Sequence, residues 1–366
     1  MVSYSFESDF QDLTQPKADS QVGGTKACLF NLLVISYDLE SSVYCQELIR
    51  IITEKFPCRI IFVRGEQDST FDFARMSKSM QVVGSENNRI VCDFISIEAT
   101  SKQFNQVPFL ILPNIVPDLP VYIVLAHDPT KDTLLLHQVE ALANRIIFGT
   151  PYVDNMQRFT RSVRQLVKTN HRQFIDIHWA RSKAWREVLA KVFLSAEKLE
   201  ALEAATSIHI VFTALPGTAS NRYELQALYL QAWLASRFGW KVKGVDGPRS
   251  TPRITYATKT GTVTISLGVQ DSEILDRGAI WSVEIMGDKD HHFLISHERD
   301  SKHVKVHASG PDRCEMPYTI FMSNYQRGSA LIGEIFYQPP SAHYASMLEM
   351  FDSDIWNQHA MQTEPK

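Results

Sequence analysis

Two kinds of hydrophobic pattern follow each other along the chain. The first part contains short, almost entirely apolar runs, and residues 29–35 are typical of a strand that is covered on both faces. Apolar side chains recur at helical spacing over residues 43–56, where Ser41 is a suitable N-cap and Pro57 marks the end. Further strands are predicted at residues 59–63, 90–97, 109–112, 121–125 and 145–148, with a helix at 134–144. This alternation predicts an α/β domain with a mostly parallel sheet.

The pattern changes in the second half of the chain. A strand at residues 208–213 precedes a long helix at 221–238, which should stop at Gly239. Alternating or β-rich segments then follow at residues 262–269, 280–286, 292–297, 303–307 and 318–322. We therefore expect a smaller α+β domain, in which an antiparallel sheet packs on the long helix.

The segments between these two patterns decide where the domains divide. Two helical stretches are predicted at residues 156–168 and 176–193, and the Ala/Glu/Lys-rich segment 195–205 is typical of an exposed helical connector. We predict a flexible N-terminal arm (1–25), an N-terminal mostly parallel α/β sandwich domain (26–200), the α+β domain (205–345) and a C-terminal tail (346–366).

Composition and charge exclude several classes of protein. The 366 residues are 44% apolar and 21% charged, as in ordinary globular proteins. With 37 Lys and Arg against 41 Asp and Glu, the net charge is -4, so nucleic acid is not an expected partner. The N-terminal residues have neither the basic start nor the apolar run of a secretory signal. The apolar stretch 107–126 contains four prolines, which disfavour a membrane span. These features predict a cytoplasmic protein without a membrane partner.

The usual signatures of enzymes and of cofactor sites are missing from the sequence. The turn after the first strand, Ser-Tyr-Asp-Leu-Glu at residues 36–40, offers neither the glycines of a dinucleotide fingerprint nor a P-loop lysine. The nucleophile elbow, the HExxH zinc motif and the EF-hand pattern are also absent. We therefore predict no catalytic residue and no cofactor.

Three weaker features leave other functions open. The loop before the long helix could bind an anion through Gly217, Ser220 and Arg222, which would suit an enzyme that binds a sugar phosphate, although an ordinary capped turn is the simpler interpretation. Five cysteines without a C-x-x-C pair are predicted to be reduced thiols, with a thiol-responsive regulator as an alternative. The late histidines His291, His292, His297, His303 and His307 could bind a metal, but solvated hairpins are the simpler interpretation, and we predict no metal site.

The most unusual local chemistry lies at residues 176–187, here called the Trp–Arg box. Its side chains Trp179, Arg181, Trp185 and Arg186 share three turns of a predicted helix. Trp and Arg are enriched at the energetic centres of protein interfaces, since they bury a large area and keep a polar group. The alternative is that the tryptophans belong to the core and the arginines pair with carboxylates. The combination favours an interface or a seam between domains.

Four segments of the chain resemble landmarks of a known family. Residues 112–121, 142–147, 176–187 and 233–240 are similar, in this order, to segments of the glucose-6-phosphate dehydrogenase assembly protein family, OpcA, and the resemblance extends over about 27–340. It departs from the family at Ala184, where a proline is expected before the second tryptophan.

The resemblance implies a non-catalytic partner of glucose-6-phosphate dehydrogenase, which catalyses the NADP-linked first step of the oxidative pentose phosphate pathway. Such a protein would act by binding the active oligomer of the dehydrogenase more tightly than its inactive form. The Trp–Arg box would then contact the partner, with the turn at 117–120, which includes Asp118, as a rigid support. Weak self-association stays open as well.

Overall fold

The computed structural model describes most of the chain, in two compact parts. The described residues are 25–37, 45–46, 48–50, 52–53, 56–65, 73–83, 90–126, 134–150, 152–169, 173–214, 223–272, 275, 277–288, 290–298, 302–311, 314–322 and 342–363. One unit consists of Met1–His127 with Lys131–Thr150, and the other of Asp128–Thr130 with Pro151–Lys366. Of the predicted N-terminal arm, only Thr25 lies within the described residues.

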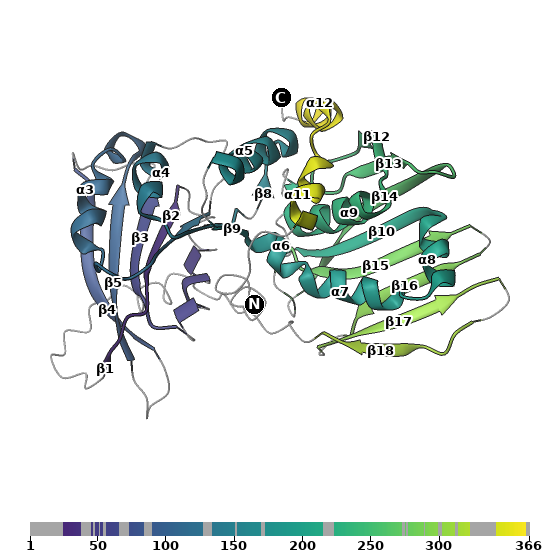
Figure 1. Ribbon diagram of the computed structural model, residues 1–366, viewed down its shortest axis with the longest axis horizontal. Coiled ribbons are helices and arrows are strands. Elements are labelled where there is room, and N and C mark those ends of the chain that lie inside the picture. The colour runs from purple at the N-terminus through teal and green to yellow at the C-terminus, as the bar shows by residue number, and fades with distance from the viewer. Residues whose placement is uncertain are drawn as a thin grey trace, which may run out of the picture. The chain divides into compact units, whose positions relative to one another are not determined.

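The first unit is built on a mostly parallel sheet, as predicted (Figure 1). Its strands are β1 (Thr25–Lys26), β2 (Asn31–Ser36), β3 (Arg59–Gly65), β4 (Arg75–Val83), β5 (Ile90–Ala99), β6 (Val121–Leu125) and β7 (Arg145–Phe148). The strands β5-β3-β2-β6-β7 pair in parallel in this order, and β1 pairs with the start of β5. Every residue of β2 is buried, which explains its continuous apolar pattern. Among the seven strands named here, β4 alone is antiparallel to its neighbour, which is β5.

Short helices connect the parallel strands, and one of them corrects a predicted strand. These helices are η1 (Ser101–Gln103), α3 (Val107–Ile111), η2 (Leu112–Asn114), α4 (Leu134–Val139) and η3 (Glu140–Leu142). The strand predicted at residues 109–112 is wrong, because this segment lies in α3 and η2. Pro108 stands in the first turn of α3, where proline fits a helix, and Val107 and Ile111 face inward while Phe109 is exposed.

The second unit is built on a long sheet that is antiparallel with one exception. Its strands are β10 (Ala205–Ala214), β12 (Lys241–Asp246), β13 (Arg253–Ala257), β14 (Thr262–Asp271), β15 (Ile280–Gly287), β16 (His292–His297), β17 (His303–Ser309) and β18 (Tyr318–Phe321). The order is β12-β13-β14-β10-β15-β16-β17-β18, and only β10 and β14 are parallel neighbours. Buried and half-exposed residues alternate in β16 and β17, as expected for strands with one covered face. Two short strands, β8 (Tyr152–Val153) and β11 (Tyr223–Glu224), pair separately.

Helices pack on one face of this sheet, where Figure 1 shows α7, α8 and α9. The helices of the unit are α5 (Met156–Thr169), α6 (Ile177–Arg181), α7 (Lys183–Val192), α8 (Ala196–Glu203), α9 (Leu225–Phe238), α11 (Ala342–Glu349) and α12 (Asp354–Gln362). The central helix α9 is buried along most of its length and ends at Gly239, whose φ of 65° is the left-handed conformation that glycine adopts most easily. No helix among these residues has the length and apolar character needed to span a bilayer.

The boundary between the units lies at Thr150, and not between residues 200 and 205 as we expected. Helices α6, α7 and α8 belong to the second unit, because α6 packs on α9, and α8 packs on β15. The segment expected to be a C-terminal tail is also part of this unit. Helix α11 packs on α9 and α5, helix α12 packs on α5 and β12, and Arg161 and Arg164 form ion pairs with Asp352.

Candidate functional site

The Trp–Arg box begins where strand β9 (Gln173–Asp176) ends and helix α6 starts. Asp176 is the N-cap of α6, and its Oδ1 accepts hydrogen bonds from the backbone nitrogens of His178 (2.9 Å) and Trp179 (3.3 Å). An aspartate at this position satisfies backbone donors that would otherwise have no partner in the first turn. The start of the box is therefore fixed by its own first residue.

The other carboxylate oxygen of Asp176 connects three segments of the second unit. Its Oδ2 accepts hydrogen bonds from the hydroxyls of Tyr229 in α9 (2.7 Å) and Tyr344 in α11 (2.9 Å). Burial raises the pKa of Asp176, and its four hydrogen bonds oppose that rise. Burial and the nearby carboxylate raise the pKa of both phenols, so the two tyrosines remain protonated donors. Asp176 thus holds the box, α9 and α11 together in the interior.

Both tryptophans of the box point into the same interior. Trp185 is buried, its Nε1 donates to the carbonyl oxygen of Ile280 in β15 (3.1 Å), and its ring lies edge-on to His297. Trp179 is buried with its ring centroid 5.6 Å from that of Tyr344. The structure therefore places the proposed anchors in the core, where they contribute packing and hydrogen bonds to the second unit.

The arginines of the box are half-buried and differ in what they contact. The Arg186 guanidinium lies 3.5 Å from the centroid of the Trp179 ring, and it donates to the Trp179 carbonyl oxygen (2.7 Å) and to Ser182 Oγ. These contacts tie one turn of the box to the next. Arg181, at the end of α6, is half-buried. Its predicted role as a contact with a partner stays a prediction.

Hydrogen bonds hold the proline-rich turn of the first unit, and Asp118 in this turn is exposed. Asp118 has a φ of 68°, which aspartate tolerates better than most residues. The buried side chain of Asn31 binds the turn from below, accepting from the Val116 nitrogen (2.8 Å) and donating to the carbonyls of Val116 and Leu119. The turn belongs to the first unit and the Trp–Arg box to the second.

The structure describes the late histidines but not the loop that was predicted to bind an anion. Gly217, Ser220 and Arg222 lie outside the described residues. His292 pairs with Glu284 (2.8 Å), and His297 is buried, where desolvation lowers its pKa to about 4. Within the described part of the chain, no group of three His, Cys, Asp or Glu side chains is arranged to hold a metal ion.

The five cysteines all lie in the described residues and are free thiols. Cys45, Cys58 and Cys92 are buried, Cys28 is half-buried and Cys314 is exposed. Burial raises the pKa of Cys58 and of Cys92, which disfavours the reactive thiolate.

The strand order of the first unit reverses where dinucleotide-binding proteins have their cofactor crevice. The sheet order reverses between β2 and β6, and such proteins bind the cofactor outside the carboxyl ends of the strands at this point. Here Tyr37 directly follows β2, and its backbone lies close to Gly65. A Cβ atom at residue 65 would stand 2.7 Å from the carbonyl oxygen of Tyr37. The Tyr37 ring packs edge-on against Phe104 at 4.6 Å. An aromatic pair thus lies at the end of β2, and residues 36–40, which follow the apolar run of this strand, contain no glycine.

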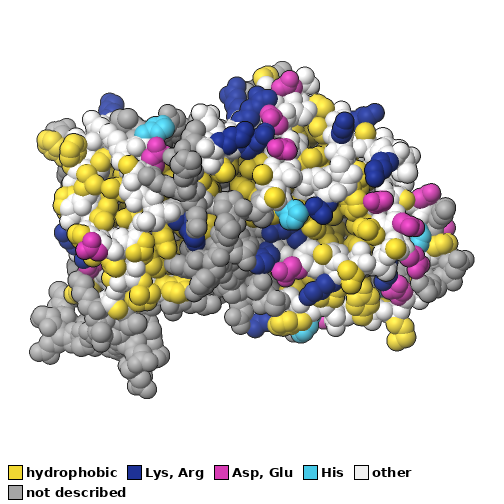
Figure 2. Space-filling model, viewed as in Figure 1, with side chains coloured by type: hydrophobic (Ala, Val, Ile, Leu, Met, Phe, Trp, Pro, Cys, Tyr) yellow, Lys and Arg dark blue, Asp and Glu magenta, His cyan; other side chains and the backbone are white. Residues whose placement is uncertain are grey.

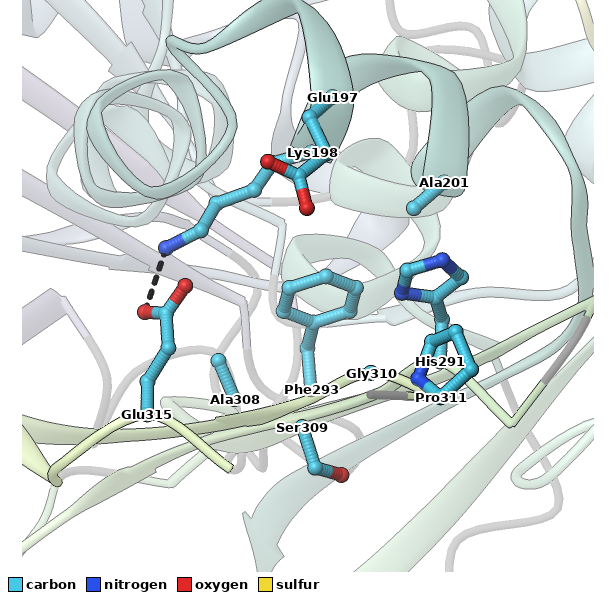
Figure 3. Close-up of a pocket in the computed structure, with 10 residues that line it drawn as sticks. All are labelled: Glu197, Lys198, Ala201, His291, Phe293, Ala308, Ser309, Gly310, Pro311 and Glu315. Carbon is cyan, nitrogen blue, oxygen red and sulfur yellow. Dashed lines mark hydrogen bonds and ion pairs between the residues drawn. The ribbon is translucent and has the colours of Figure 1, made fainter. Parts of the chain in front are cut away.

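A separate hollow of about 390 Å³ lies in the second unit (Figure 3). Glu197 and Lys198 reach into it from α8, and His291 and Phe293 line the opposite side (Figure 3). The Lys198 ammonium is 2.7 Å from a carboxylate oxygen of Glu315. Because the lining carries charges of both signs and Lys198 is paired, the hollow does not define a class of ligand.

A set of exposed apolar side chains in the first unit was not foreseen from the sequence. Phe73, Met76 and Met80 on or beside β4, with Phe109 and Leu112 of the α3 region, are 41–75% exposed. We call them the β4–α3 surface. Two contacts join the strand to the helical segment, since Asn114 Nδ2 lies 3.4 Å from Met76 Sδ, and Gln106 accepts from the Ala74 nitrogen. A helical interpretation of residues 107–114 would have put Phe109 and Leu112 on one outward face.

Solved structures identify the class of fold. KijD10, a 3-ketoreductase from Actinomadura kijaniata in complex with NADP, matches with a TM-score of 0.52 at 11% identity, over 89% of this chain and 95% of that chain. The protein yhhX, described as an oxidoreductase, matches with a TM-score of 0.50 at 10% identity, over 92% of this chain and 98% of that chain. At this identity the matches show the fold alone, which is a doubly wound unit followed by an α+β unit.

Family models identify the group to which the chain belongs. The N-terminal domain of the glucose-6-phosphate dehydrogenase subunit family matches residues 50–165, and the C-terminal domain matches residues 172–317. The chain is therefore a member of the OpcA family, which confirms the resemblance seen in its sequence. The gap between the two matches lies closer to the structural boundary at Thr150 than to the predicted one.

Two curated relatives carry the same family name. Proteins described as OxPP cycle protein OpcA from Synechocystis sp. and Synechococcus elongatus are 26% identical over 191 residues and 22% identical over 199 residues. The alignments cover 50% and 53% of this chain, and 38% and 42% of the relatives. The aligned part is thus less than half the length of each relative.

Proposed function

We propose that this protein binds glucose-6-phosphate dehydrogenase and favours its active oligomer, as a non-catalytic assembly factor of the oxidative pentose phosphate pathway. The observation that carries the proposal is the match of both parts of the chain to the two domains of the dehydrogenase subunit family. The names of the cyanobacterial relatives refer to the same metabolic cycle. A protein with this role would work in the cytoplasm, where the dehydrogenase and its substrates are found.

The surroundings of the cofactor crevice support a role without chemistry. The fold is that of dinucleotide-dependent oxidoreductases, but Tyr37 and Phe104 stand where a glycine-rich loop would approach a pyrophosphate. The buried groups Asp176, Tyr229 and Tyr344 bind one another, and this arrangement serves the stability of the second unit.

Activation then follows from differential binding. A partner that binds the active oligomer more tightly than the inactive form shifts the equilibrium by the difference in binding free energy, about 1.4 kcal/mol for each tenfold ratio of affinities. A shift from 1% to 99% active requires a ratio of about 10⁴. The exposed β4–α3 surface supplies apolar area that such binding can bury.

The test combines mass measurement with kinetics. The full chain and the dehydrogenase from the same organism are purified separately, mixed, and examined by light scattering and by the initial rate of NADPH formation. We expect a joint species, and a rate that rises with the concentration of this protein to saturation. If no joint species forms and the rate does not increase, the proposal is refuted. Turnover of glucose 6-phosphate or 6-phosphogluconolactone by the chain alone would instead support an enzyme.

A further inference from the structure

We propose that β4 is the docking strand of this protein, and that an extended segment of the dehydrogenase, rich in apolar and acidic residues, adds to it and continues the sheet of the first unit. The inference rests on the proposed function and specifies the surface and the chemistry of the contact. It is argued from the edge of the sheet, from its apolar side chains and from its charge.

The first argument is that β4 forms the edge of its sheet. It pairs with β5 along its whole length, from Arg75 to Val83, and no described strand pairs with its other side. Strands at an edge present N–H and C=O groups that can bind another chain, and proteins usually shorten or cover them. β4 has nine residues, which is long for an edge strand. Its side chains at positions 75–78 and 80 are exposed.

The second argument is the apolar character of one face of the strand. Met76 and Met80 are four residues apart and therefore point to the same side of β4. The contact between Met76 and Asn114 shows that this side faces the helical segment, where Phe109 and Leu112 are also exposed. Flexible methionines next to aromatic and aliphatic groups suit a surface that adapts to a partner's side chains. Figure 2 shows hydrophobic side chains gathered over much of the visible surface of this unit.

The third argument is the sign of the charge. Residues 73–83 contain Arg75 and Lys78 and no acidic residue, whereas the whole chain has a net charge of -4. Lys78 lies between Met76 and Met80 on the apolar side. A strand that fits here would place apolar side chains opposite the methionines and a carboxylate opposite Lys78, since opposite charges across a strand pair are favourable.

The same charge disfavours a second copy of this chain as the occupant. Two β4 strands paired antiparallel about the middle of the strand would place each Lys78 opposite Met80 of the other copy, so that the two Lys78 side chains occupy diagonal positions on one face. Like charges on neighbouring strands are destabilising. We therefore assign the strand to a different polypeptide, and in this proposal that polypeptide is the dehydrogenase.

Amide hydrogen exchange of the unmodified protein tests strand addition directly. Amides of β4 that point away from β5, roughly every second residue, should exchange fast in the free chain and at least about tenfold more slowly in the saturated complex. Side-chain docking without strand addition would leave these amides fast. If the complex forms by mass while the amides of residues 75–83 are unchanged, the inference is refuted.

Single substitutions with matched controls test the surface. Lys78→Glu and Met80→Lys should each weaken binding of the dehydrogenase by about fivefold or more, as expected for a contact near the centre of an interface. The controls are Lys243→Glu in β12, an edge strand of the second sheet, and Met286→Lys in β15, since both side chains are exposed. The controls should bind as tightly as the unmodified chain. Thermal melting establishes that all four variants are folded.

The outcomes separate the two proposals. Absence of any complex with the unmodified chain refutes the proposed function, and with it this inference. A complex that tolerates Lys78→Glu and Met80→Lys as well as it tolerates the controls refutes the docking strand and leaves the proposed function standing. Formation of homodimers that Lys78→Glu alters, without binding of the dehydrogenase, would show that the occupant is a second copy.

Discussion

The hydrogen bond from Tyr344 to Asp176 provides a sharp test of how the Trp–Arg box is held. Tyr344→Phe removes one hydroxyl that donates to the buried carboxylate at 2.9 Å and keeps the ring that packs beside Trp179. A hydrogen bond to a charged group contributes roughly 1.5–3 kcal/mol. We expect Tyr344→Phe to lower the free energy of unfolding of the second unit by an amount in this range.

Tyr256→Phe is the matched control. The Tyr256 hydroxyl is also fully buried and donates to the neutral Oε1 of Gln231 at 2.6 Å. A hydrogen bond between neutral groups contributes about 0.5–1.5 kcal/mol, so the control should lose less. All six tryptophans lie in the second unit, and their fluorescence during urea unfolding therefore reports on this unit alone.

The dependence on pH separates a charged acceptor from a neutral one. Burial raises the pKa of Asp176, and the bond from Tyr344 favours the ionised carboxylate. As the pH falls through this pKa, the carboxyl becomes protonated and the bond contributes less. The loss caused by Tyr344→Phe should therefore shrink as the pH is lowered from neutral through this raised pKa, while the loss caused by Tyr256→Phe stays constant. Equal losses in the two variants at every pH would refute this account of the buried network.

Three further predictions concern other buried contacts. Gly268→Ala should lower the melting temperature by several degrees, because its Cβ would stand 2.8 Å from the His209 ring, and a second substitution, His209→Ala, should restore most of the loss. Burial lowers the pKa of His297 from 6.5 to about 4, so the unfolded chain binds the proton at a higher pH than the folded one. The free energy of unfolding of the second unit should therefore fall by roughly 3 kcal/mol between pH 7 and pH 4. His297→Phe should remove this part of the pH dependence, measured by urea unfolding. Asn31→Ala removes three hydrogen bonds to the proline-rich turn and should destabilise the first unit by about 2–4 kcal/mol, measured by amide exchange of residues 31–36, whose unchanged protection would contradict it.

The sequence predicted the sheets well wherever burial leaves a strong periodic signal. Strand β2 is buried on both faces and reads as a continuous apolar run, and β16 and β17 are buried on one face and read as alternation. The stop of α9 at Gly239 was predicted from the conformational freedom of glycine. These features are local, so a single sequence contains them.

Features that depend on distant partners were not predictable in the same way. The run at residues 109–112 is too short to distinguish a strand from a helix by periodicity. Pro108, in the first turn of α3, favours the helix. Amphipathic helices α6–α8 require a sheet to cover, but the sequence does not say which sheet, so the boundary was placed after them rather than at Thr150. Tyr344 was not predicted to have a structural role, because nothing local indicates that its hydroxyl meets a carboxylate 168 residues away.

The Trp–Arg box shows why composition alone does not distinguish an interface from a core. Both environments favour large apolar surfaces that carry a polar group. The two environments differ in whether the polar group forms its hydrogen bonds inside the same unit. Here Trp185 Nε1 donates to Ile280, and Asp176 accepts from two tyrosines of the same unit. The polar groups of Asp176 and Trp185 are therefore satisfied within the second unit.

The same reasoning explains why β4 was not predicted and why it suits a partner. Periodicity in a strand arises because one face or both faces are buried within the chain. The side chains of β4 at positions 75–78 and 80 are exposed, so burial among the described residues imposes no strict alternation there, and Lys78 interrupts the face that carries Met76 and Met80. A strand that is nine residues long, unpaired along one side by any described strand, and flanked by Phe109 and Leu112 has its apolar side chains without cover inside the molecule. The proposed contact with the dehydrogenase would supply the burial that this strand does not find among the described residues.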